Sequence, residues 1–434
     1  MSRHAVAVVA GAVLRLASAV SAEWELRYDE RNAIRPAIKD RVVNVDTGDS
    51  GTDFPRYLNE LGIDEVRIRF RGQTPGVKKL SIIWSGGSQG ADCFTVSLDG
   101  RPVGRSRTVL SELRPYAWYR DEFIVRLAAD AEHVIALSSP PASRSSVEFA
   151  ALCLSDDVNR IYQPLCGKAI GSLRSYEAQI KDPGYMAQSE HLSIFVPASH
   201  RAGADRLAIF LERAYMKMAE IYGIEPIFRF SIEHYPPGHP RCSGGISGQA
   251  TIGYPVEAIE RFARWGASDV RGFAGYTEEM SHGFKACYRC DGTYEALGVA
   301  VQEDIVRSLV PPAVADAFWL PEHDTWRKTH QAYRAAGNVN PDHKQYPNGV
   351  LYTRILNHLF LTLRSEYGPR MWPDFFRVIR QMDYPLHRAE KTERLRTYAD
   401  IFAVLFGRDM RKEFADFGID LSADPPWGWQ TYEQ

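Results

Sequence analysis

The first part of the chain alternates apolar and polar residues in short runs. Between residues 64 and 155, turn residues such as Asp99-Gly100 separate these runs. A period of two places successive side chains on opposite faces of a strand, so the pattern predicts an antiparallel β-sandwich over residues 23–160. The predicted strands are Val66–Phe70, Leu80–Trp84, Phe94–Leu98, Phe123–Leu127 and Val134–Leu137.

After Cys166 the hydrophobic period changes from that of strands to that of helices. Strands are predicted at 192–196, 227–232 and 250–254, and apolar residues three and four apart predict a helix over 205–222. Beyond residue 255 the pattern is almost entirely helical. The fold class is therefore α+β, with a second domain over 161–434 that holds a small sheet and a helical lobe. The predicted helices of that lobe are 269–285, 294–309, 349–367, 373–382 and 395–406.

The N-terminal segment has the features of an export signal. Arg3 precedes an apolar run from Ala5 to Val13, and the segment ends in the small residues Val20-Ser21-Ala22. This predicts a signal peptide over 1–22 and a secreted or periplasmic protein, although Arg15 interrupts the apolar run and leaves a disordered or helical N-terminus as the alternative. No later stretch has the 18 or so apolar residues that predict a membrane span.

Composition narrows the classes of partner. A formal net charge of −2 provides no positive field for nucleic acid. The chain has nine Trp, 21 Tyr and 20 Phe. This supply of aromatic residues fits either hydrophobic cores or platforms on which sugars stack. Six cysteines permit up to three disulfides in an exported protein, or buried thiols, and the single CxxC at Cys287 and Cys290 argues against a four-thiolate zinc site.

One segment carries the chemistry of the second domain. In Tyr276-Thr-Glu-Glu-Met-Ser-His-Gly-Phe284, the residues Glu278 and His282 are four positions apart and share one face of a helix. Glu279 lies one step around that helix. Glu303 follows 21 positions after His282, on the next predicted helix.

This pattern resembles the gluzincin metallopeptidases, the thermolysin-like and aminopeptidase-like zinc enzymes. They carry HExxH on one helix and a Glu on the next, and bind Zn²⁺ through two His and that Glu. The resemblance implies that Glu279 is the catalytic general base and that His282 and Glu303 are metal ligands. It also implies a hydrogen-bonding role for a Tyr after the zinc site, for which Tyr346 is the first choice and Tyr352 the reserve.

The chain departs from the family at the first ligand, where Glu278 stands in place of His. Arg307 stands where thermolysin-like enzymes have an Asp that steadies that His. We therefore predict an ion pair between Glu278 and Arg307. Two alternatives remain: an oxygen-rich metal site made of Glu278, His282 and Glu303, and a domain that binds no metal. If the second helix is rotated by one residue, Asp304 takes the place of Glu303 as ligand.

The sequence favours a secreted metal-dependent hydrolase, a peptidase that acts on extracellular protein or glycoprotein. The stretch Asp92–Gly100 resembles a hairpin of galactose-binding-like modules, so the sandwich is either a carbohydrate-binding module or a structural accessory. Two alternatives are an inactive peptidase-fold protein that binds extracellular glycan, and a glycan-active enzyme with Glu279 and Glu303 as paired carboxylates.

Overall fold

A computed structural model describes most of the chain. The described residues are 24–27, 42–46, 57–58, 65–70, 75–86, 93–106, 118–129, 131–138, 147–159, 161–163, 170, 172–242, 246–247, 250–287, 295–337, 350–381 and 391–421. The predicted signal peptide and Tyr346 lie outside them. The chain divides into two compact units, residues 1–162 and 163–434.

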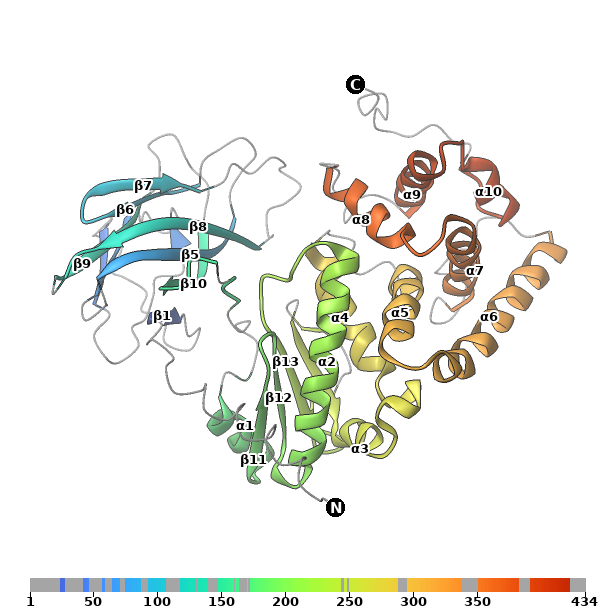
Figure 1. Ribbon diagram of the computed structural model, residues 1–434, viewed down its shortest axis with the longest axis horizontal. Coiled ribbons are helices and arrows are strands. Elements are labelled where there is room, and N and C mark those ends of the chain that lie inside the picture. Colours follow the sequence, from blue (N-terminus) through green and yellow to red (C-terminus); the bar gives the residue numbers. More distant parts are fainter. Residues whose placement is uncertain are drawn as a thin grey trace, which may run out of the picture. The chain divides into compact units, whose positions relative to one another are not determined.

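The first unit consists of two five-stranded sheets (Figure 1). Neighbouring strands pair antiparallel throughout the first sheet, whereas β2 and β4 of the second sheet are parallel. The first sheet has the order β1 (Trp24–Arg27), β10 (Val147–Ser155), β5 (Gly76–Gly86) and β8 (Trp118–Leu127), with β3 (Tyr57–Leu58) also paired to β10. The second has the order β2 (Val42–Asp46), β4 (Glu65–Phe70), β9 (His133–Ser138), β6 (Thr95–Leu98) and β7 (Arg101–Arg105).

Alternation along each strand builds the core of this unit. In β4, Val66, Ile68 and Phe70 are buried while Arg67 and Arg69 are exposed, as a period of two requires. Side chains from both sheets form one hydrophobic cluster. Cys93 and Cys153 are buried thiols, so burial accounts for these two cysteines.

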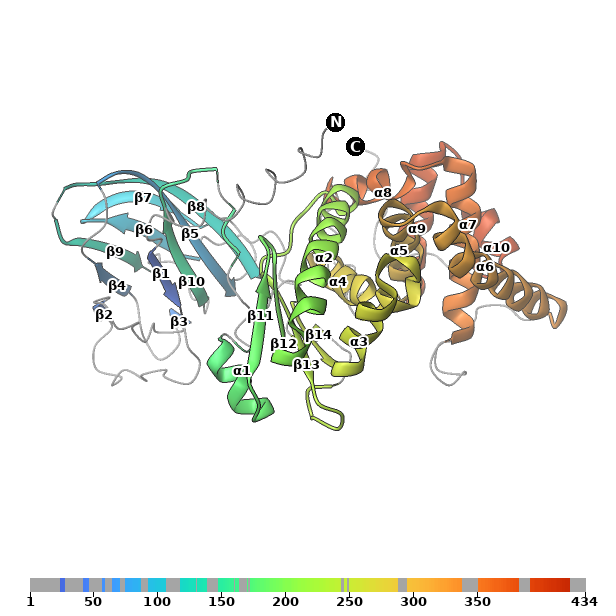
Figure 2. The same cartoon turned by 60° about the horizontal axis from the view of Figure 1, so that its bottom comes forward.

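The second unit places helices around a mixed five-stranded sheet (Figures 1 and 2). The strand order is β11 (Gly184–Gln188), β12 (Leu192–Pro197), β13 (Phe230–Tyr235), β15 (Thr251–Pro255) and β14 (Ile246–Ser247). The pairs β12–β13 and β13–β15 are parallel, and the two edge strands are antiparallel to their neighbours. Helices α1 (Leu173–Ile180) and α2 (Arg201–Tyr222) pack against β11 and β12, and α2 ends at Gly223 with a φ of 63°.

The rest of the unit is helical, which confirms the α+β class. Its helices are α3 (Val256–Trp265), α4 (Ala274–Cys287), α5 (Glu295–Leu309), α6 (Pro312–Ala335), α7 (Val350–Tyr367), α8 (Met371–Gln381), α9 (Lys391–Phe406) and α10 (Arg411–Asp416). The five helices predicted for the lobe correspond to α4, α5, α7, α8 and α9. Helix α6 is absent from the predictions, because Pro321 lies inside it and proline ordinarily ends a helical pattern. Within the described residues, no helix is long and apolar enough to span a membrane.

Candidate functional site

Helix α4 presents the predicted motif on a partly exposed face. Its buried face carries Tyr276, Met280 and Phe284, spaced four residues apart and at most 3% exposed. Glu278 and His282 are displaced from that face, with side chains 24% and 18% exposed. The apolar spacing of the helix thus fixes which side chains are buried and leaves the two motif residues accessible to a ligand.

The motif residues lie within ligand distance of one another. His282 Nε2 and Glu278 Oε1 are 2.9 Å apart. Glu278, Glu279 and His282 each offer one ligand atom, and these three atoms lie within 4.8 Å of one another. One helical turn therefore gathers two carboxylates and one imidazole.

The spacing of these atoms fits a divalent cation. Two ligand atoms at about 2.0–2.2 Å from one ion, with an angle of about 90–109° between them, lie about 2.8–3.6 Å apart. The observed 2.9 Å between His282 and Glu278 is inside that interval. A donor set of carboxylate oxygen and imidazole nitrogen is also one that Zn²⁺ accepts.

Glu303 lies on α5 and is engaged by other residues. Arg307 Nε donates to its Oε1 at 2.7 Å, and His323 Nε2 lies 2.8 Å from its Oε2. Burial raises the pKa of Glu303, but the hydrogen bonds from His323 and Arg307 outweigh burial and lower it below the ordinary value. Glu278, His282 and Glu303 do not offer three atoms within 4.8 Å of one another, so the structure does not bring the third predicted ligand to the other two.

The predicted ion pair between Glu278 and Arg307 is wrong. Arg307 pairs with Glu303, one turn earlier on α5, and its Nη1 lies 2.7 Å from Asp316 Oδ1 on α6. Both partners are closer to Arg307 along the chain than Glu278 is: Glu303 lies four residues earlier on the same helix, and Asp316 lies on the next helix. The neighbouring Asp304 is bound by Arg364 through two hydrogen bonds, at 2.9 and 3.1 Å, and is likewise turned to another partner.

His323 is a site residue that the sequence analysis missed. It lies on α6, whose buried residues Ala315, Trp319, Trp326 and Tyr333 recur four and seven positions apart. That spacing is the signal that could have identified the helix despite Pro321. The approach of His323 to Glu303 depends on how α6 packs beside α5, and no local sequence pattern predicts that packing.

A buried hydrogen-bonded pair lies beneath the motif helix. His234 Nδ1 donates to the Phe195 carbonyl at 3.1 Å, so its Nε2 accepts from the Tyr276 hydroxyl at 2.6 Å. Burial lowers the pKa of His234 to about 4, which keeps the imidazole neutral at pH 7. The pair anchors α4 to β13 in the centre of the sheet.

Tyr254, on β15, reaches the motif helix from the sheet. Its ring packs edge-on against the Tyr276 ring, with 4.7 Å between the two ring centroids. Its hydroxyl oxygen lies so close to α4 that a Cβ added at Gly275 would be 3.4 Å away from it. The hydroxyl is buried and has no hydrogen-bond partner within the described part of the chain. Burial raises the pKa of this phenol, and the nearby charge of Glu279 raises it further. Tyr254 therefore keeps a neutral, buried hydroxyl beside Gly275 of the motif helix.

The other predicted residue is outside what the structure describes. Tyr346, the predicted hydrogen-bond donor, lies in the stretch 338–349, which is not among the described residues. Its reserve, Tyr352, falls within α7.

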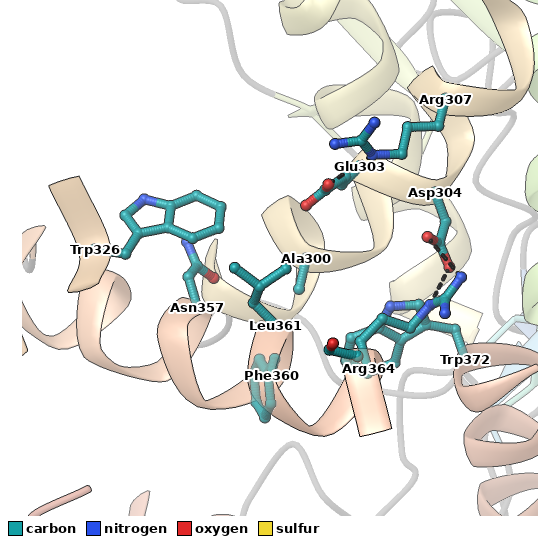
Figure 3. Close-up of a pocket in the computed structure, with 11 residues that line it drawn as sticks. Ala300, Glu303, Asp304, Arg307, Trp326, Asn357, Phe360, Leu361, Arg364 and Trp372 are labelled. Atoms are coloured by element: carbon teal, nitrogen blue, oxygen red, sulfur yellow. Dashed lines mark hydrogen bonds and ion pairs between the residues drawn. The ribbon is translucent and has the colours of Figure 1, made fainter. Parts of the chain in front are cut away.

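Glu303, Asp304 and Arg307 also line a cavity of about 180 Å³ in the helical lobe (Figure 3). Its walls come from α5, α6, α7 and α8, and its aromatic residues include Trp326 and Trp372. The cavity adjoins the carboxylate that the sequence analysis assigned to the metal.

Comparisons with known proteins give similarity of fold at low scores. No protein-family model and no curated protein matches the chain. Similar solved structures include a conserved protein of unknown function from Bacillus anthracis str. Ames, with 10% identity over 81% of this chain and 70% of that one and a TM-score of 0.37. They also include yeast LTA4 hydrolase in complex with bestatin (10% identity, 90% of this chain and 66% of that one, TM-score 0.37). The catalytic module of the metalloprotease ZmpA from Clostridium perfringens is a third (12% identity, 84% and 72%, TM-score 0.34). Metallopeptidases are thus among the similar structures, but such scores support no inference about individual residues.

Proposed function

We propose that the second unit is a metal-dependent hydrolase, and specifically a peptidase. The observation that carries this proposal is the group of Glu278, Glu279 and His282 on an accessible face of α4, with His282 Nε2 and Glu278 Oε1 2.9 Å apart. Two carboxylates and an imidazole at this spacing can hold one divalent cation and leave a carboxylate for proton transfer.

Each motif residue then has one role. Glu278 and His282 hold the ion, for which Zn²⁺ is our choice, and Glu279 accepts and returns a proton as general base. A bound Zn²⁺ supplies Lewis acidity that polarises a carbonyl group. Glu303 becomes the third ligand only if its carboxylate leaves Arg307 and His323, to which it is hydrogen bonded.

Two tyrosines complete the proposed site. Tyr346 keeps the role that the gluzincin resemblance implies, a donor to the substrate carbonyl oxygen. Tyr254 supports it from the sheet, because its buried hydroxyl has no partner among the described residues and packs beside Gly275 of the motif helix. The predicted signal peptide places the substrate outside the cytoplasm, so extracellular proteins and glycoproteins are the proposed targets, with the sandwich as a glycan-binding accessory.

One observation favours a second candidate, a non-catalytic protein that keeps the peptidase fold and binds extracellular glycan. Both oxygens of Glu303 are bound by cationic or hydrogen-donating side chains, which leaves the metal one ligand short of the predicted set. In the third alternative, paired carboxylates acting on glycans, Glu303 can serve only as the base or nucleophile and Glu279 as the general acid, because a general acid needs a raised pKa and that of Glu303 is lowered.

The test combines metal binding with hydrolysis. Zn²⁺ is titrated calorimetrically into the full chain and into His282→Ala, with His200→Ala as matched control, because His200 pairs with an exposed carboxylate on the surface of the same unit. We expect one Zn²⁺ per chain, abolished in His282→Ala and retained in the control.

Hydrolysis of an unfolded protein substrate is followed by mass spectrometry, with and without chelator. Glu279→Gln should retain the metal and lose cleavage. Stoichiometric zinc without cleavage would argue for a metal-binding protein, and absence of saturable zinc binding would move the assignment to the non-catalytic candidate.

A further inference from the structure

Three aromatic rings meet where the end of α10 packs on α6 and α7. His330 lies on α6, His358 on α7, and Phe417 directly follows α10, the helix that lies beside the other two (Figure 1). The His330 ring stacks on the Phe417 ring, with 4.4 Å between the centroids and 15° between the planes. The two imidazole centroids are 5.2 Å apart, and the His358 centroid is 5.3 Å from that of Phe417. The two histidines therefore form the surface against which Phe417 packs.

Burial works against a positive charge on either imidazole. Among the described residues, His330 Nε2 and His358 Nδ1 are buried and make no hydrogen bond. Burial and the charge of Arg334 lower the pKa of His330, although a hydrogen bond with the Asp416 backbone raises it in part. Burial lowers the pKa of His358 to about 4, and the neighbouring His330 and Arg327 contribute. Both rings are therefore mainly neutral at pH 7, and each is harder to protonate once the other is charged.

The titratable and charged side chains around the pair on α6 and α7 are cations or a further imidazole. They are His323, Arg327 and Arg334 on α6, and Arg354, one turn before His358 on α7. On α10, the Asp416 carboxylate is already paired with Lys412. The face of Phe417 attracts an imidazolium and offsets part of the repulsion from these cations.

The end of α10 is docked mainly by apolar burial. Phe414 and Ile419 are 0% and 2% exposed, and the Ile419 N–H donates to the Phe414 carbonyl at 2.9 Å. Between them the chain turns at Gly418, with a φ of 80°. Opening of this segment would remove Phe417 from the two imidazoles and return them to water, where the pKa of histidine is about 6.5.

We propose that His330, His358 and Phe417 form a pH-sensitive latch, in which the neutral imidazoles hold residues 408–421 on α6 and α7 and protonation of the imidazoles loosens that segment. The released rings bind protons more tightly than the docked rings. Docking is therefore strongest above pH 6.5, weakens as pH falls from 6.5 towards 4, and levels off below that. The latch uses neither a metal nor the motif on α4, so it stands or falls independently of the proposed hydrolase. A purely structural aromatic cluster is the competing explanation, and it predicts docking that does not change over this pH range.

The first measurement titrates the imidazoles directly. Histidine side chains of the full chain are labelled with ¹³C and followed by NMR from pH 8 to pH 4. The two resonances are identified by their contacts with the Phe417 ring and checked with His330→Gln and His358→Gln. We expect both rings to titrate below 6.5, with His358 near pH 4. A midpoint at or above 6.5 for either ring would overturn the proposal.

The second measurement follows docking by hydrogen–deuterium exchange of peptides from residues 408–421. Samples are labelled at pH 7.5 and pH 5.0, with labelling times scaled to the intrinsic exchange rate at each pH. A docked pKa of about 4 against a released value of about 6.5 corresponds to docking roughly 30-fold weaker at pH 5 from His358 alone. Because the rings are half-buried and water screens part of this effect, we expect protection to fall at least fivefold. Amides of β12 and β13, in the centre of the sheet, should keep their protection.

Variants show whether the two imidazoles cause the change. In His330→Gln/His358→Gln the side chains stay neutral, so protection of residues 408–421 should be the same at both pH values. His200→Gln, which replaces a histidine on the surface of the same unit, is the matched control and should behave as wild type. The latch is refuted by pH-independent protection in the wild type, by an equal loss of protection in β12 and β13, or by an undiminished pH effect in the double variant. If the double variant does not fold, the imidazole midpoints and the wild-type exchange decide the matter.

Discussion

Release of Glu303 from Arg307 should tighten zinc binding if Glu303 is the third ligand of the proposed site. To turn toward His282, the carboxylate must give up the 2.7 Å hydrogen bond from Arg307 Nε. The carboxylate is 11% exposed and the guanidinium 32% exposed, so this charge-assisted contact is partly shielded from water. Such a contact is worth about 1–2 kcal/mol, between the values for exposed and for buried pairs.

The substitution Arg307→Met removes that competing contact and keeps most of the side-chain volume. The expected gain of about 1–2 kcal/mol corresponds to a zinc dissociation constant roughly 5- to 30-fold lower. The hydrogen bond from His323 persists in the variant, so the gain is limited to the contribution of Arg307. Calorimetric titration of Zn²⁺ at pH 7, with a competing chelator if binding is tight, measures the change directly.

Two variants show whether the effect comes from Glu303. Arg364→Met is the matched control, because Arg364 binds the adjacent Asp304 on the same helix and its removal releases a different carboxylate. The double variant Arg307→Met/Glu303→Gln should lose the gain. Zinc affinity within about twofold of wild type in Arg307→Met would refute the assignment of Glu303 to the metal and leave Glu278 and His282 as its protein ligands.

Three further predictions address neighbouring parts of the second unit. Tyr254→Phe should lower kcat for the proposed hydrolysis about tenfold with little change in the free energy of unfolding, because its hydroxyl has no partner among the residues that the structure describes; an unchanged kcat would exclude Tyr254 from the site. Glu303→Gln should reduce unfolding free energy at pH 7 by about 2–3 kcal/mol in chemical denaturation. Because the pKa of Glu303 is lowered in the folded state, its contribution to the unfolding free energy is fully present above the unfolded-state pKa of about 4.3 and is lost as pH falls through the folded-state pKa. The unfolding free energies of wild type and variant should therefore converge in acid. A constant difference between them down to pH 2–3 would contradict this. Gly253→Ala should disrupt β15 and lower the thermal midpoint of this unit by several degrees, since the new Cβ would lie 1.9 Å from the Arg241 carbonyl oxygen; a midpoint equal to wild type would show that the strand shifts freely.

The local sequence determined much of this molecule. The alternation in β4 and the spacing of Tyr276, Met280 and Phe284 on α4 fix which faces are buried, because each depends only on the geometry of one strand or helix. The same reasoning placed Glu278 and His282 together, since residues four apart on a helix are neighbours by construction.

The partners of Glu303 were decided by tertiary structure alone. Glu303 is hydrogen bonded to His323, which lies twenty positions later on a helix whose sequence pattern is interrupted by Pro321. Arg307 forms ion pairs with Glu303 and Asp316 and not with Glu278. Tyr254 reaches α4 from a strand, and Asn357 and Trp372 meet at one cavity from different helices. These contacts depend on how the helices and strands pack in space and on which charged group lies nearest after packing. The periodicity of the sequence contains no information about either.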